Sequence, residues 1–135
     1  MPRNDDGFTL IEAIVAASLL VAVSLGTAQL FGFALAQNLV ARQQLVMGLL
    51  ASSKLDELSS AIDAGSVVLT AADALERSLD GSTDTVLDAG RTYVRRWRIA
   101  QVPGYGDAFA VAVRVLPATG GGDVRVVTVR ASGAP

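Results

Sequence analysis

The chain contains no cysteine and no histidine, and only 5% of its 135 residues are aromatic. Without cysteine it can form no disulfide and no thiolate, so its folded part must be held together by its core. Without histidine it lacks the commonest general base and the commonest metal ligand. The sequence also contains no glycine-rich phosphate loop, no G-x-S-x-G motif and no metal-ligand spacing. We therefore expect neither an enzyme nor a protein that carries a cofactor.

Charged residues are missing from a long stretch near the start of the chain. No Asp, Glu, Lys or Arg occurs between Ala13 and Ala41. Residues 8–36 are apolar, apart from Glu12 and some small or weakly polar side chains. About 20 apolar residues are enough for a helix to cross the hydrocarbon core of a bilayer. Residues 8–36 are therefore predicted to form a single membrane-spanning helix.

The helical pattern continues beyond this apolar stretch. Leucine, valine and isoleucine recur at spacings near three and four as far as Ile62, with charged residues such as Lys54 and Glu57 between them. This spacing predicts an amphipathic helix, and Gly65 is its expected end. One helix from about Phe8 to Ile62 would be about 80 Å long. Its first half would lie in lipid and its second half would pack on a small domain.

The remaining residues predict a small sheet. Thr70 to Asp73 resembles a capping box, so we expect a short helix from Thr70 to about Leu79 and then a loop over residues 82–90. Alternating residues predict three strands, joined by short turns that favour an antiparallel meander. These strands are expected over residues 93–100, 109–115 and 124–130, within a sheet of about 91–131. The predicted fold class is therefore α+β, with a long N-terminal helix packed on a small antiparallel sheet and a globular domain spanning residues 37–135.

Charge is unevenly distributed in this domain. Residues 37–90 contain three basic and eight acidic residues, a net charge of −5. Residues 91–135 contain seven arginines and two aspartates, a net charge of +5. Two interpretations are open: the halves neutralise each other within one fold, or they make a polar subunit that stacks head to tail in an assembly.

The most specific motif is G-F-T-L-I-E, residues 7–12, which joins a polar leader, residues 1–7, to the apolar stretch. Glu12 is a lone carboxylate at the edge of a membrane-length segment, where an unpaired charge costs several kcal/mol. Leader and motif together resemble the processing signal of type IV prepilins. The resemblance implies cleavage by prepilin peptidase between Gly7 and Phe8 and N-methylation of Phe8. It also implies that Glu12 pairs with the α-amine of a neighbouring subunit during assembly.

A second, more diffuse likeness lies downstream. Residues 51–58, Ala-Ser-Ser-Lys-Leu-Asp-Glu-Leu, and the aromatic pair Tyr93 and Trp97 look like features of V-type minor pilins and I-type minor pseudopilins. Gln29 stands where major pilins often carry a proline, which also favours a minor subunit. The leader departs from the family, because Asp5 and Asp6 weaken its usual basic character and with it the positive-inside signal.

The resemblance implies a structural subunit that primes or caps a type IV pilus or a type II secretion pseudopilus. Its partners would be prepilin peptidase and other minor and major pilins or pseudopilins. It would lie in the inner membrane as a single-pass protein, with its C-terminal domain in the periplasm or outside, and would then enter the filament. Pilus, secretion and competence machines share this N-terminal chemistry, so the sequence does not choose between them.

Three alternatives remain. Arg95, Arg96 and Arg98 could bind nucleic acid in a DNA-uptake or adhesive tip pilin, with aromatic side chains stacking on bases. Arg95 and Arg96 should point to opposite faces of a regular strand, however, which favours a solvated or subunit-contacting role. Tyr93 and Trp97 are expected to pack in the core.

The Ala34-Leu35-Ala36 pattern could instead be a signal peptidase site, and the apolar stretch could be a plain single-pass anchor.

Overall fold

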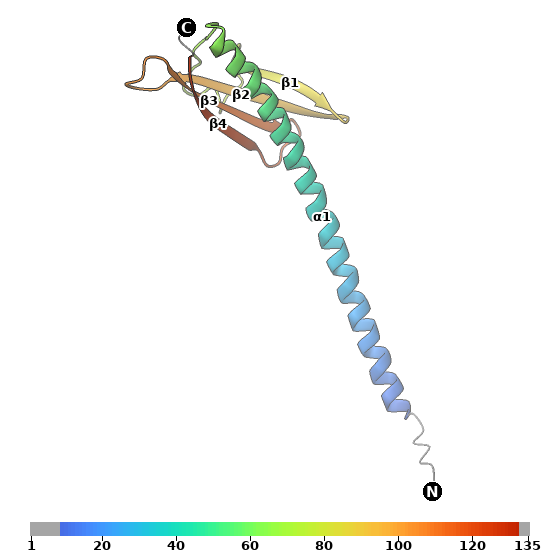
Figure 1. Ribbon diagram of the computed structural model, residues 1–135. Coiled ribbons are helices and arrows are strands. Elements are labelled where there is room, and N and C mark those ends of the chain that lie inside the picture. The colour runs from blue at the N-terminus through green and yellow to red at the C-terminus, as the bar shows by residue number, and fades with distance from the viewer. Residues whose placement is uncertain (1–8, 133–135) are drawn as a thin grey trace. The chain divides into compact units, whose positions relative to one another are not determined.

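The computed structural model describes residues 9–132, which form one long helix followed by a four-stranded sheet (Figure 1). The elements are α1 (Leu10–Asp63), β1 (Thr83–Asp88), β2 (Arg91–Gln101), β3 (Ala108–Pro117) and β4 (Val124–Ala131). The strands pair in the order β1-β2-β3-β4, each antiparallel to the next. This arrangement confirms the predicted α+β fold class and the antiparallel meander.

The chain divides into two compact units, with the boundary between Val40 and Ala41, and α1 contributes to both. In the first unit every described residue is exposed. The helix continues without interruption through Gly26 and Gly32, although glycine costs up to about 1 kcal/mol relative to alanine inside a helix. The second unit contains the last turns of α1 and the whole sheet.

The C-terminal end of α1 is closed by a Schellman motif at the predicted glycine. Gly65 adopts a left-handed conformation with φ of +71°. Its N–H donates to the carbonyl of Ile62 at 3.0 Å, and the N–H of Ser66 donates to the carbonyl of Ala61 at 2.9 Å. These two bonds satisfy carbonyl groups that would otherwise lack a partner at the end of a helix.

The core of the second unit lies between one side of α1 and one face of the sheet. Buried residues of α1 follow one another at spacings of three and four, which places them on a single helix face. The buried cluster comprises Met47, Ala51, Leu58, Ile62, Tyr93, Trp97, Ile99, Val111, Val113 and Val115. Tyr93 and Trp97 are therefore core residues, as the sequence predicted.

The expected short helix from Thr70 to Leu79 is wrong, because this segment forms irregular turns. Thr70 does not cap a helix. Its hydroxyl accepts the N–H of Ile99 at 2.8 Å, and its own N–H donates to the carbonyl of Ile99 at 3.1 Å. Within the segment, the backbone makes a single i to i+4 bond, from Arg77 to Asp73. The backbone of Ile99 in β2 therefore binds the Thr70 hydroxyl, which would otherwise be free to cap a helix.

The expected loop over residues 82–90 is also wrong, because most of it is β1. Asp88 pairs with Arg91, so only Ala89 and Gly90 connect β1 to β2. Both residues have positive φ, 46° for Ala89 and 78° for Gly90, which is the backbone of a type I′ turn. Alanine is uncommon at the first position of such a turn, and this obscured the hairpin in the sequence.

Candidate functional site

Glu12 lies in the first turn of α1, three residues after Thr9. The backbone N–H of Glu12 donates to the Thr9 hydroxyl at 3.3 Å, and the N–H of Ala13 donates to the Thr9 carbonyl at 3.1 Å. Thr9 is therefore the N-cap of α1, and T-x-x-E is the spacing of a capping box. A carboxylate at this position also interacts favourably with the positive end of the helix dipole. The T-x-x-E spacing could have revealed this helix start in the sequence.

No side chain among residues 9–132 forms an ion pair with Glu12. The other two residues of the predicted processing site, Gly7 and Phe8, lie outside the described residues. Of the predicted processing and assembly site, the structure therefore describes Glu12 and the helix that carries it.

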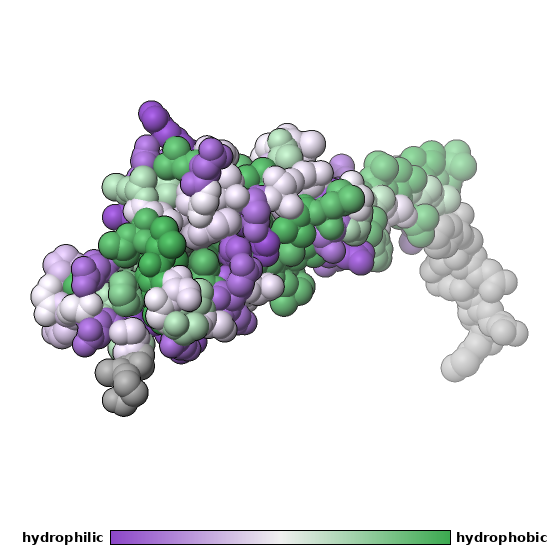
Figure 2. All heavy atoms as spheres, turned by 90° about the horizontal axis from the view of Figure 1, so that it is seen from above, coloured by the Kyte–Doolittle hydropathy of each residue, from purple (hydrophilic) through white to green (hydrophobic). Residues whose placement is uncertain are grey.

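The first unit of α1 exposes an almost continuous apolar surface. The exposed fraction of its large apolar side chains runs from 52% at Val40 to 78% at Leu10. One stretch of α1 is long and apolar enough to cross a membrane, and none of that stretch is buried against the other residues of 9–132. In Figure 2, hydrophobic atoms make up most of the visible surface next to the grey N-terminal residues.

Three hydroxyl side chains in this stretch are satisfied within the helix. The hydroxyls of Ser18, Ser24 and Thr27 each donate to the carbonyl four residues earlier, at 2.7–2.8 Å. Such bonds leave these hydroxyl groups with no need of water, so they are compatible with a lipid environment. Glu12 is the single ionisable side chain between Thr9 and Ala41.

The second set of predicted site residues is Arg95, Arg96 and Arg98, and the structure separates them. Arg95 shares the α1-facing side of β2 with Trp97, and it forms a bidentate pair with Asp84 at two distances of 2.7 Å. Arg96 and Arg98 alternate with these residues and lie on the opposite face. The three arginines therefore do not form one basic patch.

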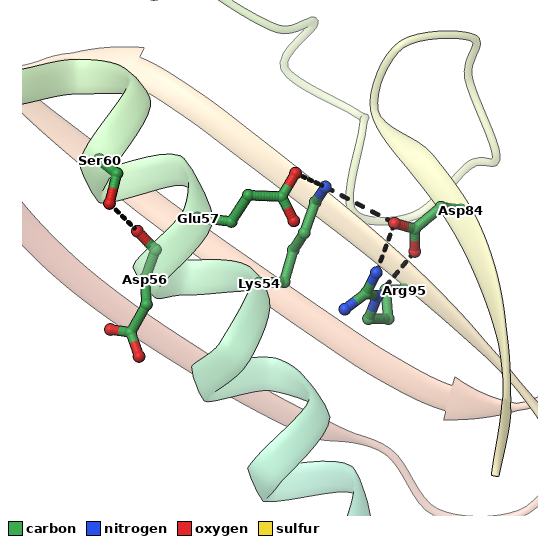
Figure 3. A network of polar contacts seen from close by, with 6 residues as sticks. All are labelled: Lys54, Asp56, Glu57, Ser60, Asp84 and Arg95. Atoms are coloured by element: carbon green, nitrogen blue, oxygen red, sulfur yellow. Dashed lines mark hydrogen bonds and ion pairs between the residues drawn. The ribbon is translucent and has the colours of Figure 1, made fainter. Parts of the chain in front are cut away.

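Arg95 belongs to a network that joins α1 to the sheet (Figure 3). Lys54 on α1 is 6% exposed. Its ammonium lies 2.7 Å from the carboxylate of Glu57 and 3.6 Å from that of Asp84. The same ammonium lies 4.1 Å from the centre of the Trp97 ring, a cation–π contact. Two cations and two carboxylates thus balance each other at this junction.

Hydrogen bonding to Asp84 raises the pKa of Arg95 above its ordinary value, although desolvation opposes the effect. Hydrogen bonds to Asp123 and Glu76 likewise raise the pKa of Arg114. A raised pKa in the folded state stabilises the fold at neutral pH, and this contribution is lost only as the pH rises through that pKa. Arginine remains charged at physiological pH, so the guanidinium groups of Arg95 and Arg114 keep their charge there.

Within residues 9–132, two ion pairs join the acidic half of the domain to the basic half. Asp84 and Glu76 come from the acidic half, and they pair with Arg95 and Arg114 of the basic half. The halves therefore neutralise each other in part within one fold. Within residues 9–132, the structure gathers no group of three or more acidic side chains that could hold a metal ion.

Sequence reasoning missed Asp84 as the shared partner of Arg95 and Lys54, because Asp84 lies on a strand that was expected to be a loop. In comparisons with known proteins, no family model, curated protein or solved structure matches the chain.

Proposed function

We propose that this chain is a minor pilin or pseudopilin, a structural subunit that primes or caps assembly of a type IV pilus or a type II secretion pseudopilus. Prepilin peptidase cuts between Gly7 and Phe8 in this proposal. The N-terminal helix then moves from the bilayer into the filament core. The globular domain lies in the periplasm or outside and faces outward from the filament.

One observation carries the proposal: Glu12 is a lone carboxylate in the first turn of an apolar helix, and residues 9–132 leave it exposed. The capping box accounts for a polar side chain at this position, but at the edge of a membrane-length segment a carboxylate without a charged partner costs several kcal/mol. The new α-amine of Phe8 on a neighbouring subunit supplies that partner. A subunit docked at the wrong height leaves both charges unpaired, so the pair also sets the register of assembly.

The proposal is tested by replacing Glu12 with glutamine, which keeps the shape of the side chain and removes its charge. We expect Glu12→Gln to remain in the membrane fraction and to fall at least 10-fold in the sheared filament fraction. Ser18→Ala is the matched control, because the Ser18 hydroxyl bonds only within its own helix. Entry of Glu12→Gln into filaments at the wild-type level would contradict the assembly role and leave a plain anchor.

A second candidate function, DNA binding by a tip subunit, is weaker. Of the three arginines that suggested it, Arg95 is committed to Asp84 and Arg96 donates to the carbonyl of Glu76 at 2.7 Å. The aromatic side chains of Tyr93 and Trp97 are buried and offer no surface for base stacking. Unchanged binding of labelled DNA to the chain between 50 and about 200 mM salt would argue against phosphate contacts.

A further inference from the structure

The sheet has a face that points away from α1, here called the outer face. Val111, Val113 and Val115 of β3 are fully buried on the α1 side, so the alternating residues of β3 lie on the outer face. Strand register places the outer-face residues of β2, β3 and β4 in three rows. These rows are Arg96–Arg114–Arg125, Arg98–Ala112–Val127 and Ala100–Ala110–Val129.

One end of the outer face is covered by the irregular segment between α1 and β1. Arg96 donates to the carbonyl of Glu76 at 2.7 Å, and Arg114 forms an ion pair with the Glu76 carboxylate at 2.6 Å. Arg114 also donates to the carbonyl of Leu75 at 3.3 Å. Leu75 and its neighbour Ala74 are buried. Here a non-helical segment supplies carbonyl and carboxylate oxygens to two arginines and buries apolar side chains.

The other end of the outer face is an open groove of about 500 Å³. Small side chains line it, those of Ala100, Ala110 and Ala112, and the groove also contacts Val127 and Val129. The two valines are 58% and 62% exposed. Exposed β-branched residues beside a hollow of alanines form an apolar surface that the chain's described residues leave uncovered.

Two arginines, Arg98 and Arg125, line the same groove. The Nε of Arg98 is buried and has no hydrogen-bond partner. Within residues 9–132 neither arginine pairs with a carboxylate. The three rows contain four arginines. The carboxylates that pair with them are those of Glu76 and Asp123, so the outer face has an excess of two positive charges.

We propose that this groove binds an extended acidic segment of another protein. The covered end supplies a precedent: carbonyl and carboxylate oxygens of the covering segment reach Arg96 and Arg114, and Ala74 and Leu75 of that segment are buried. At the open end, Arg98 of β2 and Arg125 of β4 line the groove on either side of β3, and the described residues supply no covering segment there. The excess of two positive charges calls for carboxylates on the partner. The inference concerns the second unit alone and does not depend on the filament proposal.

A polypeptide suits the groove better than a nucleic acid. Nucleic acid sites combine cations with exposed aromatic rings, and this groove is lined by alanine and valine instead. Burial of Val127 and Val129 favours apolar side chains on the partner, which a phosphate backbone does not provide.

The test is photocrosslinking in the cells that naturally make the chain. The photoreactive residue p-benzoylphenylalanine replaces Val129 in the full-length protein, and the crosslinked peptide is identified by mass spectrometry. We expect an adduct with a segment of another protein that is rich in Asp and Glu. Adding Arg98→Gln and Arg125→Gln together should reduce this adduct at least 10-fold.

Arg130→Gln is the control, because Arg130 lies on β4 opposite Phe109, on the α1 side, and should leave the adduct unchanged. Ala110→Leu fills the groove without altering charge and should also reduce the adduct at least 10-fold. A loss in this variant as well would not depend on the folding of the double arginine variant. An adduct with a nucleic acid or only with a second copy of this chain would overturn the proposal. So would no adduct, or one that both groove changes leave intact.

Discussion

At the residue scale, Asp84 is the one carboxylate among residues 9–132 that forms ion pairs with two different cations. It accepts both hydrogen bonds from Arg95 and lies 3.6 Å from the buried ammonium of Lys54. Glu57 also contacts Lys54, but its side chain is 62% exposed against 31% for Asp84. Solvent screens the Glu57 pair, so the two carboxylates should differ in their contribution to stability.

Asp84→Asn leaves two cations near each other without their shared partner. We expect it to lower the free energy of unfolding by about 2 kcal/mol, because a partly buried charge loses its counterion. Glu57→Gln, the matched control, should cost less than about 1 kcal/mol. Urea unfolding of a fragment that begins at Ala41 measures both, with fluorescence of Trp97, the single tryptophan, as the probe. Equal costs for the two changes would contradict this ranking.

At the element scale, the end of α1 depends on backbone geometry at one residue. Gly65 has φ of +71°, a conformation that side-chain-bearing residues adopt only with strain. Gly48 lies inside the same helix, and an added Cβ there would meet nothing within 4 Å. Replacing each glycine with alanine should therefore change stability in opposite directions.

Gly65→Ala should destabilise the domain by about 1–2 kcal/mol, because alanine must adopt the left-handed conformation. Gly48→Ala should stabilise it by about 0.5–1 kcal/mol, since alanine is the better helix former. The same unfolding assay separates these signs. A stabilising effect of Gly65→Ala would show that the Schellman motif does not close the helix in solution.

The elements that were predictable from sequence are those with a strong period or a specific end signal. The apolar run and the three- and four-residue spacing identified α1, Gly65 identified its end, and alternation identified β2, β3 and β4. β1 was missed because Thr83 to Asp88 contains two aspartates and ends in a turn with alanine at positive φ. The false helix after Thr70 arose because Ile99, distant in sequence, takes the capping hydroxyl.

At the scale of the whole molecule, the two units present different chemistry. The first is an apolar helical stretch with one carboxylate and hydroxyls satisfied internally. The second has its own core and an ion-pair network that joins helix to sheet. The position of Glu12 in the chain was evident from sequence. The separation of Arg95 from Arg96 followed from strand alternation, but the partners of each required the fold.

The central claim is that the chain follows the prepilin route, and mass spectrometry of its mature N-terminus tests that claim most directly. The measurement compares cells with and without their prepilin peptidase. We predict a chain that begins at N-methylated Phe8 and appears only when the peptidase is present. A chain that begins at Gln37 would indicate an ordinary secreted domain, and an uncut chain in both strains would indicate a simple membrane anchor. Either of these results would contradict the proposed function.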